Sequence, residues 1–90
     1  MEAETFRYEQ DPGHGWVEVP RFMLEKLGVD GLITQYSYQR GNLVYLEEDQ
    51  DLNTFLMAYR EHYGQDPDLR EVHVDSTPIR RFPRYSKWPA

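Results

Sequence analysis

The residues that could do chemistry begin with a histidine in a turn. His14 lies between two glycines in the turn-forming sequence DPGHG at 11–15, and the large aromatic Trp16 follows it. An exposed imidazole in such a turn could act as a general base or bind a ligand. Histidines also occur in turns without a chemical role. His62 and His73 show no metal-ligand spacing relative to His14, so we expect no zinc site.

A run of acids forms the second candidate, in the sequence EEDQD at 47–51. Its members are Glu47, Glu48, Asp49 and Asp51. Carboxylates bind hard cations, but such sites need ligands from several segments or an ordered loop with glycine, and DxDxDG spacing is absent. Acids before a helix also compensate its macrodipole and its free N–H groups. We therefore predict a helix start with Asp49 or Asp51 as the N-cap, and no metal site.

Tyrosines and an arginine lie between these two stretches. The sequence YSYQRGNLVY at 36–45 places Tyr36, Tyr38 and Arg40 at alternate positions. Arg40 could bind a phosphate or carboxylate through paired hydrogen bonds, or be an ordinary exposed arginine of a turn. Tyrosine and arginine are enriched where binding energy concentrates at interfaces. If Tyr36, Tyr38 and Tyr45 face solvent they form a binding patch, and if they face inward they belong to the core.

The C-terminal residues 76–90 are basic and aromatic. Their cations are Arg80, Arg81, Arg84 and Lys87, interleaved with Phe82, Tyr85 and Trp88. Such interleaving is typical of surfaces that stack single-stranded nucleic acid, but four cations and three prolines match that pattern weakly. A free tail would expose its aromatic rings. We therefore predict that it docks on the acidic domain of its own subunit or of a neighbour.

Two strands and a short helix are expected around the histidine turn. In TFRYEQ at 5–10 aromatic residues alternate with polar ones, a period of two that predicts a strand. WVEV at 16–19 predicts a second strand, antiparallel to the first. Pro20 suits the first turn of a helix and Gly28 suits its end, so we expect a helix of about two turns between them.

A hairpin is expected around the tyrosines, and two registers are open. A loop at 41–42, with glycine at its first central position, fits a type II′ turn and sets Tyr38 opposite Tyr45. A loop at 40–41 sets Tyr36 opposite Tyr45 and gives a more uniformly apolar face. We favour the first register because of its turn chemistry.

A longer helix and a last strand follow the acids. Apolar residues recur at helical spacing, at Leu52, Phe55, Leu56, Tyr59 and Tyr63, before Gly64. This spacing predicts a helix with one buried face. LREVHV at 69–74 predicts the last strand. The order ββαββαβ predicts an α+β domain at 1–75, in which two helices pack on a mostly antiparallel sheet.

Composition and charge limit the class of protein. The 90 residues are enough for one domain, and they include no cysteine, which excludes disulfides and thiolate metal sites. No apolar run approaches a membrane helix, and the acidic N-terminal sequence is not a signal peptide, so we expect a cytoplasmic protein. All 16 acids lie in residues 1–75, whose net charge is −10, whereas residues 76–90 carry +4. The acidic charge disfavours nucleic-acid phosphates and favours basic partners.

Several stretches resemble one known group of proteins. They are PGHGWVEVP at 12–20, LGV at 27–29, YSYQRGNLVYLEED at 36–49, FL at 55–56 and STPIRRFPRY at 76–85. This series resembles a widespread family of small proteins carried by phages, plasmids and other mobile elements. The resemblance implies a cytosolic accessory protein of a mobile element in its host cell. Small acidic proteins of that origin often bind host machinery, for example as counter-defence inhibitors of CRISPR or restriction systems.

Three functions follow from these patterns. The first is a non-enzymatic binding module whose acidic surface engages a basic surface of a host protein. The second is a protein that binds a small ligand or nucleotide through a pocket formed by His14, Trp16, Tyr36, Tyr38 and Arg40. The third is a small hydrolase-like enzyme that uses His14 with Glu47 or Glu48. We favour the first, expect no cofactor, limit nucleic-acid contact to the tail, and consider a homo-oligomer compatible with the small core.

Overall fold

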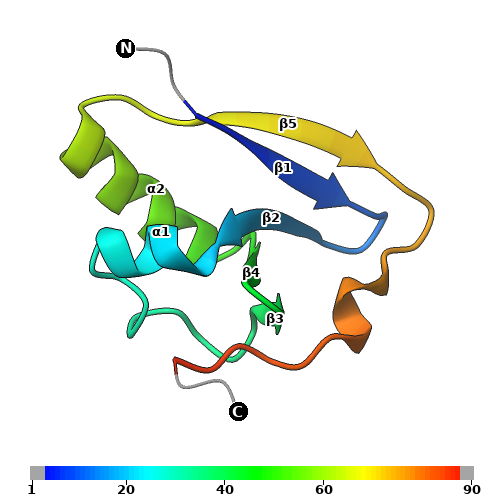
Figure 1. Cartoon of the computed structure of the whole chain (residues 1–90). Coiled ribbons are helices and arrows are strands. Elements are labelled where there is room, and N and C mark those ends of the chain that lie inside the picture. Colours follow the sequence, from blue (N-terminus) through cyan, green and yellow to red (C-terminus); the bar gives the residue numbers. More distant parts are fainter. Residues whose placement is uncertain (1–3, 88–90) are drawn as a thin grey trace.

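Five strands and two helices form an α+β fold in residues 4–87, the part of the chain that the computed structural model describes (Figure 1). The elements are β1 (Thr5–Gln10), β2 (Gly15–Pro20), α1 (Arg21–Lys26), β3 (Tyr38–Arg40), β4 (Leu43–Glu47), α2 (Asp51–Tyr63) and β5 (Asp68–His73). A short 3₁₀-helix, η1 (Pro78–Arg81), follows β5 and was not anticipated from the sequence. The predicted order is therefore matched as far as β5.

The sheet is mixed, with the strand order β3-β4-β2-β1-β5. The pairs β1–β2, β2–β4 and β3–β4 are antiparallel, as predicted, but β5 pairs parallel with β1. The prediction of a mostly antiparallel sheet is thus correct only in part. The connection through α2 carries the chain from β4 across the sheet to its far edge, and such a helical crossover returns the next strand in the same direction.

The hairpin of β3 and β4 has the register that turn chemistry favours. Tyr38 pairs with Tyr45 and Arg40 with Leu43. Gly41 has a φ of 60° whereas Asn42 does not have positive φ, which is the combination that a type II′ turn requires. Tyr36 lies before the strand, in a turn, and is 70% exposed.

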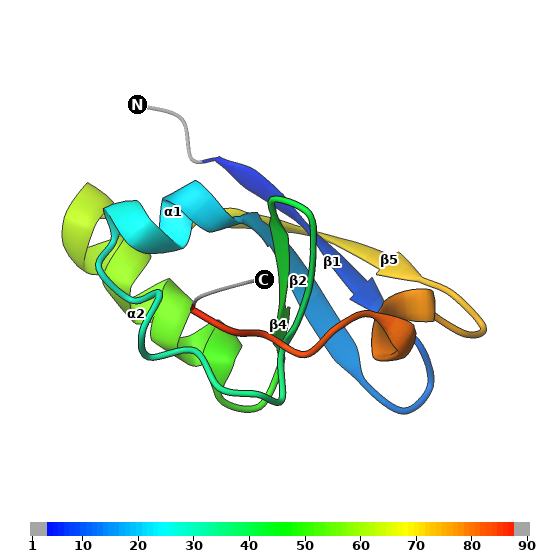
Figure 2. The same ribbon diagram turned by 60° about the horizontal axis from the view of Figure 1, so that its bottom comes forward.

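The two faces of the sheet are covered in different ways. Helices α1 and α2 lie on one face, where Val17, Val19, Val44 and Leu46 pack against residues of the helices such as Phe55 (Figure 2). On the other face a smaller cluster joins Trp16, Tyr45 and Ile79, and Ile79 belongs to η1. The C-terminal part of the chain therefore supplies the cover that the helices do not give to this face.

The segment at 76–87, which we call the C-terminal segment, continues along the outer edge of β3. Its Pro83 accepts a hydrogen bond from the N–H of Gln39, and the N–H of Tyr85 donates to the carbonyl of Ser37. The Tyr85 hydroxyl donates to the Asp30 carbonyl at 2.5 Å, and its ring is 4% exposed. Trp88, the last aromatic residue of the predicted tail, lies outside the described residues.

Two carboxylates organise the start of α2, although neither Asp49 nor Asp51 is the N-cap. The N-cap residue is Gln50, without a side-chain cap. Instead the Glu47 carboxylate accepts hydrogen bonds from the N–H groups of Asp49, Gln50 and Asp51, at 2.8, 2.7 and 2.6 Å. The prediction that acids stabilise this helix start is confirmed, but the capping acid stands before the helix rather than at its first residues.

Asp51 is the first residue of α2 and is fully buried. Its carboxylate accepts hydrogen bonds from the hydroxyl of Ser37 at 2.5 Å, from the hydroxyl of Thr34 at 2.7 Å and from the N–H of Thr34 at 3.1 Å. A buried carboxylate needs such donors, because removal from water is otherwise costly. Asp51 therefore fixes the loop before β3 to the first turn of α2.

Replacing Asp51 tests this link. We expect Asp51→Ala to lower the free energy of unfolding by about 2–4 kcal/mol, because it leaves the buried hydroxyl of Ser37 and the half-buried hydroxyl of Thr34 without their acceptor. Chemical denaturation measures the change. Asp49→Ala is the matched control, since Asp49 is exposed two positions earlier, and it should change stability by less than about 0.5 kcal/mol. Equal losses in both variants would show that the buried network contributes nothing.

Candidate functional site

A cavity of about 370 Å³ lies where the β1–β2 turn, β3, the end of β4 and the C-terminal segment meet. Nine residues named from the sequence line it: His14, Trp16, Tyr36, Tyr38, Glu47, Glu48, Asp49, Arg80 and Arg84. We call it the aromatic–acidic cavity. Segments far apart in the chain thus form one site.

The aromatic side of the cavity is built on β2 and β3. Trp16 is 4% exposed and pairs across the sheet with Glu47, which brings the ring next to the acids. The ring centres of Trp16 and Tyr38 are 6.2 Å apart, and those of Trp16 and His14 are 5.9 Å apart. Gly15 permits this arrangement, because a Cβ there would lie 2.6 Å from the Tyr8 ring.

The acidic side contains carboxylates with different partners. Glu47 accepts the hydrogen bonds at the start of α2, as described above. Glu48 accepts a hydrogen bond from the Tyr8 hydroxyl at 2.9 Å. Burial, followed by this hydrogen bond, raises the pKa of Tyr8 to about 12. Asp49 is exposed at the mouth of the site. Within residues 4–87 no cluster of three or more His, Cys, Asp or Glu has the geometry to hold a metal ion.

Two arginines of the C-terminal segment cover the aromatic rings. The Arg80 guanidinium lies 4.9 Å from the centre of the Trp16 ring, and that of Arg84 lies 5.5 Å from the centre of the Tyr38 ring. Arg84 also donates to the Gln35 carbonyl at 2.9 Å. Cation–π contacts of this kind contribute about 0.5–1 kcal/mol at exposed positions.

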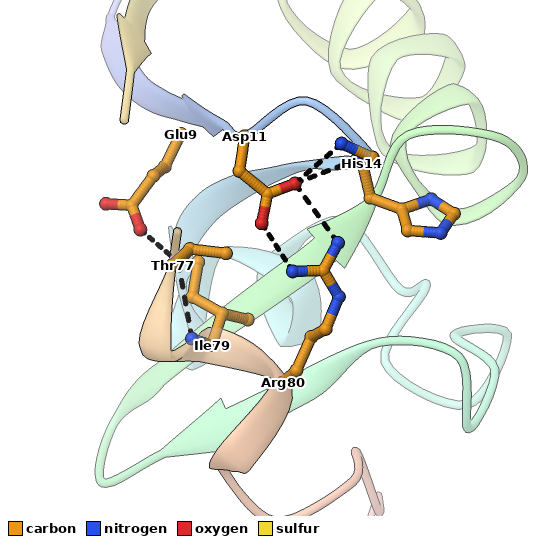
Figure 3. Close-up of polar contacts among 7 residues, drawn as sticks. Glu9, Asp11, His14, Thr77, Ile79 and Arg80 are labelled. Carbon is orange, nitrogen blue, oxygen red and sulfur yellow. Dashed lines mark hydrogen bonds and ion pairs between the residues drawn. The ribbon is translucent and has the colours of Figure 1, made fainter. Parts of the chain in front are cut away.

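Arg80 is held in place by Asp11, and Figure 3 shows this pair together with the β1–β2 turn. The Asp11 carboxylate accepts from the guanidinium and also from the N–H groups of Gly13 and His14, each at 3.0 Å. The hydrogen bonds from Arg80 are the main reason why the pKa of Asp11 is well below its usual range. The His14 ring turns away from the pair, so it is not part of this network (Figure 3).

Arg40 and Arg81 are not brought to the cavity. The Arg40 guanidinium lies 4.7 Å from the centre of the Phe82 ring, beside a separate hollow of about 180 Å³. The hairpin register explains this position, because it places Arg40 at the opposite end of β3 from the cavity. Tyr45 is 6% exposed beneath the C-terminal segment, so Tyr36, Tyr38 and Tyr45 do not form one solvent-facing patch.

Sequence reasoning missed two residues that shape the cavity. Asp11 could have been found as the first residue of the DPGH turn, since an Asx side chain at that position often accepts backbone N–H groups. Its partner Arg80 is 69 positions away, and no local pattern connects the two. The sequence pattern identifies Tyr8 only as a strand residue, because its contact with Glu48 depends on the pairing of β1, β2 and β4.

No protein-family model, curated protein or solved structure matches this chain. Among the described residues, no helix has the length and apolar character needed to cross a bilayer. The interpretation of the cavity therefore rests on its own geometry and charge.

The Tyr8 hydroxyl gives a direct test of the wall around Glu48. We expect a Tyr8 pKa of about 12, measured as the difference in phenolate absorbance between the wild type and Tyr8→Phe during an alkaline titration. Because the pKa is raised in the folded protein, the stabilisation is complete below the ordinary value of 10.0 and is lost as the pH rises toward 12. Glu48→Gln should lower the pKa, and Glu61→Gln on α2 should not. A pKa of 10 in the wild type would contradict the contact.

The Asp11–Arg80 pair predicts a loss of stability in acid. Asp11→Asn keeps an oxygen for the backbone N–H groups of the turn but removes the charge that Arg80 contacts. Folding lowers the pKa of Asp11 below its ordinary value of 3.8. The wild type should therefore be more stable than this variant at pH values above 3.8, and the difference should be lost as the pH falls through the lowered pKa of the folded protein. Denaturation at a series of pH values measures the difference. Asp68→Asn is the control, because Asp68 is exposed and lies at the opposite end of the paired strands β1 and β5 from Asp11. A difference that does not change with pH would contradict the ion pair.

Proposed function

We propose that the protein is a non-enzymatic binding module that accepts a cationic side chain of a basic partner protein in the aromatic–acidic cavity. The observation that carries the proposal is the joining of aromatic rings and carboxylates from separate segments in one hollow of about 370 Å³. Aromatic faces and carboxylates attract ammonium and guanidinium groups through the same sign of potential.

The protein's own arginines support this chemistry. Arg80 and Arg84 already place guanidinium groups over Trp16 and Tyr38, so the aromatic side of the cavity is a favourable environment for cations. The Tyr36 ring, which is 70% exposed, and the exposed Asp49 carboxylate extend the same surface toward solvent. A partner's arginine or lysine between these two side chains would continue the row of stacked cations.

The charge of the whole chain supports a basic partner. The net charge is −6, and residues 1–75 carry −10. Such a surface attracts basic proteins over long distances and repels nucleic-acid phosphates. In the C-terminal segment Arg80 contacts Asp11 and Arg84 contacts the Gln35 carbonyl, so these cations are not simply available to phosphates. This charge and the resemblance to proteins of mobile elements support a role as a cytoplasmic accessory protein of such an element. Its partner would be a host protein that normally binds nucleic acid, and its role would be that of a counter-defence inhibitor of CRISPR or restriction systems.

A small planar ligand, such as a nucleotide base, is the second candidate. The volume of about 370 Å³ favours it, because small-molecule sites begin near 300 Å³. Hydrolysis assisted by His14 has less support. The Glu47 and Glu48 carboxylates accept hydrogen bonds from backbone N–H groups and from Tyr8, and within residues 4–87 no hydrogen bond joins either of them to the imidazole of His14.

Binding of an arginine-rich peptide tests the proposal. We expect fluorescence anisotropy to show binding that weakens as salt is raised, with NMR shifts at the cavity residues. Tyr36→Ala and Asp49→Asn should each weaken binding roughly three- to tenfold, which corresponds to a contact of about 1 kcal/mol. Asp75→Asn makes the same change of charge away from the cavity and should leave the affinity nearly unchanged.

Two outcomes would contradict the proposal. If Asp75→Asn weakens peptide binding as much as Asp49→Asn does, the peptide responds only to net charge. If ATP shifts the NMR signals of Trp16 and Tyr36 while the peptide does not, the small-ligand candidate replaces the protein partner.

A further inference from the structure

The two edges of the sheet differ in how they end. The outer edge of β3 is covered, since Tyr38 forms a bridge with Arg84 and the backbone of the C-terminal segment bonds to Ser37 and Gln39. The outer edge of β5 pairs with nothing in residues 4–87. In Figure 1, β5 lies at the margin of the molecule, beyond β1. An open edge presents rows of N–H and C=O groups to which another strand can bond.

The groups that point outward from β5 follow from its pairing with β1. The N–H groups of Asp68 and Val74 donate to carbonyls of Glu4 and Gln10, each at 2.8 Å. Because alternate residues of a strand bond to the same side, the residues between them at even positions also face β1. Leu69, Glu71 and His73 therefore direct their N–H and C=O groups away from the molecule.

A second copy of this chain can supply the missing strand. When two identical edge strands pair antiparallel, the two-fold axis is perpendicular to the sheet. It passes midway between one residue and the same residue of the second copy, and we name each axis by that residue. An axis at Arg70 or Glu71 would place like charges directly opposite one another. An axis at His73 would place Glu71 opposite Asp75, which repels in the same way.

Two further axes lie at the uncharged, apolar residues of β5. An axis at Leu69 would pair Glu71 with Pro67, which has no N–H to donate. An axis at Val72 has neither fault. It sets Glu71 of each copy opposite His73 of the second copy, so that outward-facing residues form the hydrogen-bonded pairs. The β-branched Val72 side chains then meet at the axis, where such residues pack well.

We infer that the protein forms a symmetric dimer in which the β5 strands of two copies pair antiparallel about Val72. The Gln10 amide donates to one oxygen of Glu71 at 2.9 Å, which orients the carboxylate on the helix-covered face. The other oxygen then meets His73 of the second copy. The aromatic–acidic cavity lies at the β3–β4 side of the sheet, so the dimer does not depend on the proposed function.

Charge exchange across the axis tests both the edge and its register. Sedimentation equilibrium from micromolar to millimolar protein should show a monomer–dimer equilibrium. His73→Glu should weaken the dimer roughly tenfold or more, because both symmetric pairs change from attractive to repulsive. The double variant Glu71→Lys with His73→Glu should restore it. His62→Glu makes the same substitution on the exposed face of α2 and should leave the dimer unchanged.

Hydrogen exchange in the wild type provides a readout that does not depend on variants. The amides of Leu69, Glu71 and His73 should exchange more slowly as the protein concentration rises. A wild type that stays monomeric at millimolar concentration would overturn the inference, and so would unprotected amides at these positions. A dimer that His73→Glu does not weaken, or that the folded double variant does not restore, would exclude the Val72 axis. Circular dichroism melts establish that each variant is folded.

Discussion

The buried Asp51 carboxylate is the interaction on which the arrangement of the other parts depends. It accepts hydrogen bonds from three donor groups of Thr34 and Ser37, and the Ser37 hydroxyl in turn accepts one from the N–H of Glu47 at 3.1 Å. The carbonyl of Ser37 accepts from the N–H of Tyr85. One satisfied buried charge thus joins the loop before β3, the end of β4, the start of α2 and the C-terminal segment.

This network also decides which side chains reach the cavity. Ser37 points inward to Asp51, so its neighbours Tyr36 and Tyr38 point away from it, and both line the cavity. Glu47 lies between the network and the site, because its N–H bonds to Ser37 while its carboxylate caps α2. The cavity is therefore formed by side chains whose backbone is fixed from the buried side. Such fixed sites lose little entropy when a partner binds.

The sequence predicted most elements, because local patterns determine them. Period-two alternation located β1, β-branched and aromatic residues located β2, and helical spacing located α2. Glycine at the first loop position selected the register that sets Tyr38 opposite Tyr45. What it could not predict depends on distant pairs. An acid at a helix start suggests a cap, and only the fold shows that Asp51 faces Thr34 and Ser37. The parallel pairing of β5 with β1 likewise follows from topology, not from local pattern.

The two proposals have a joint consequence through symmetry. Trp16, Tyr38 and Glu47 point to the face of the sheet opposite the helices, since Val17 and Leu46, their neighbours in the strands, point to the helices. A two-fold axis perpendicular to the sheet keeps both cavities of a dimer on that same face. One exposed cation in one cavity gives a weak contact. In a dimer, both cavities can face one extended basic surface, and once the first cavity has bound, binding of the second is intramolecular. The avidity of the dimer can therefore exceed the affinity of one cavity by orders of magnitude without any new interaction. A small acidic protein with a modest cavity could in this way hold a large basic partner.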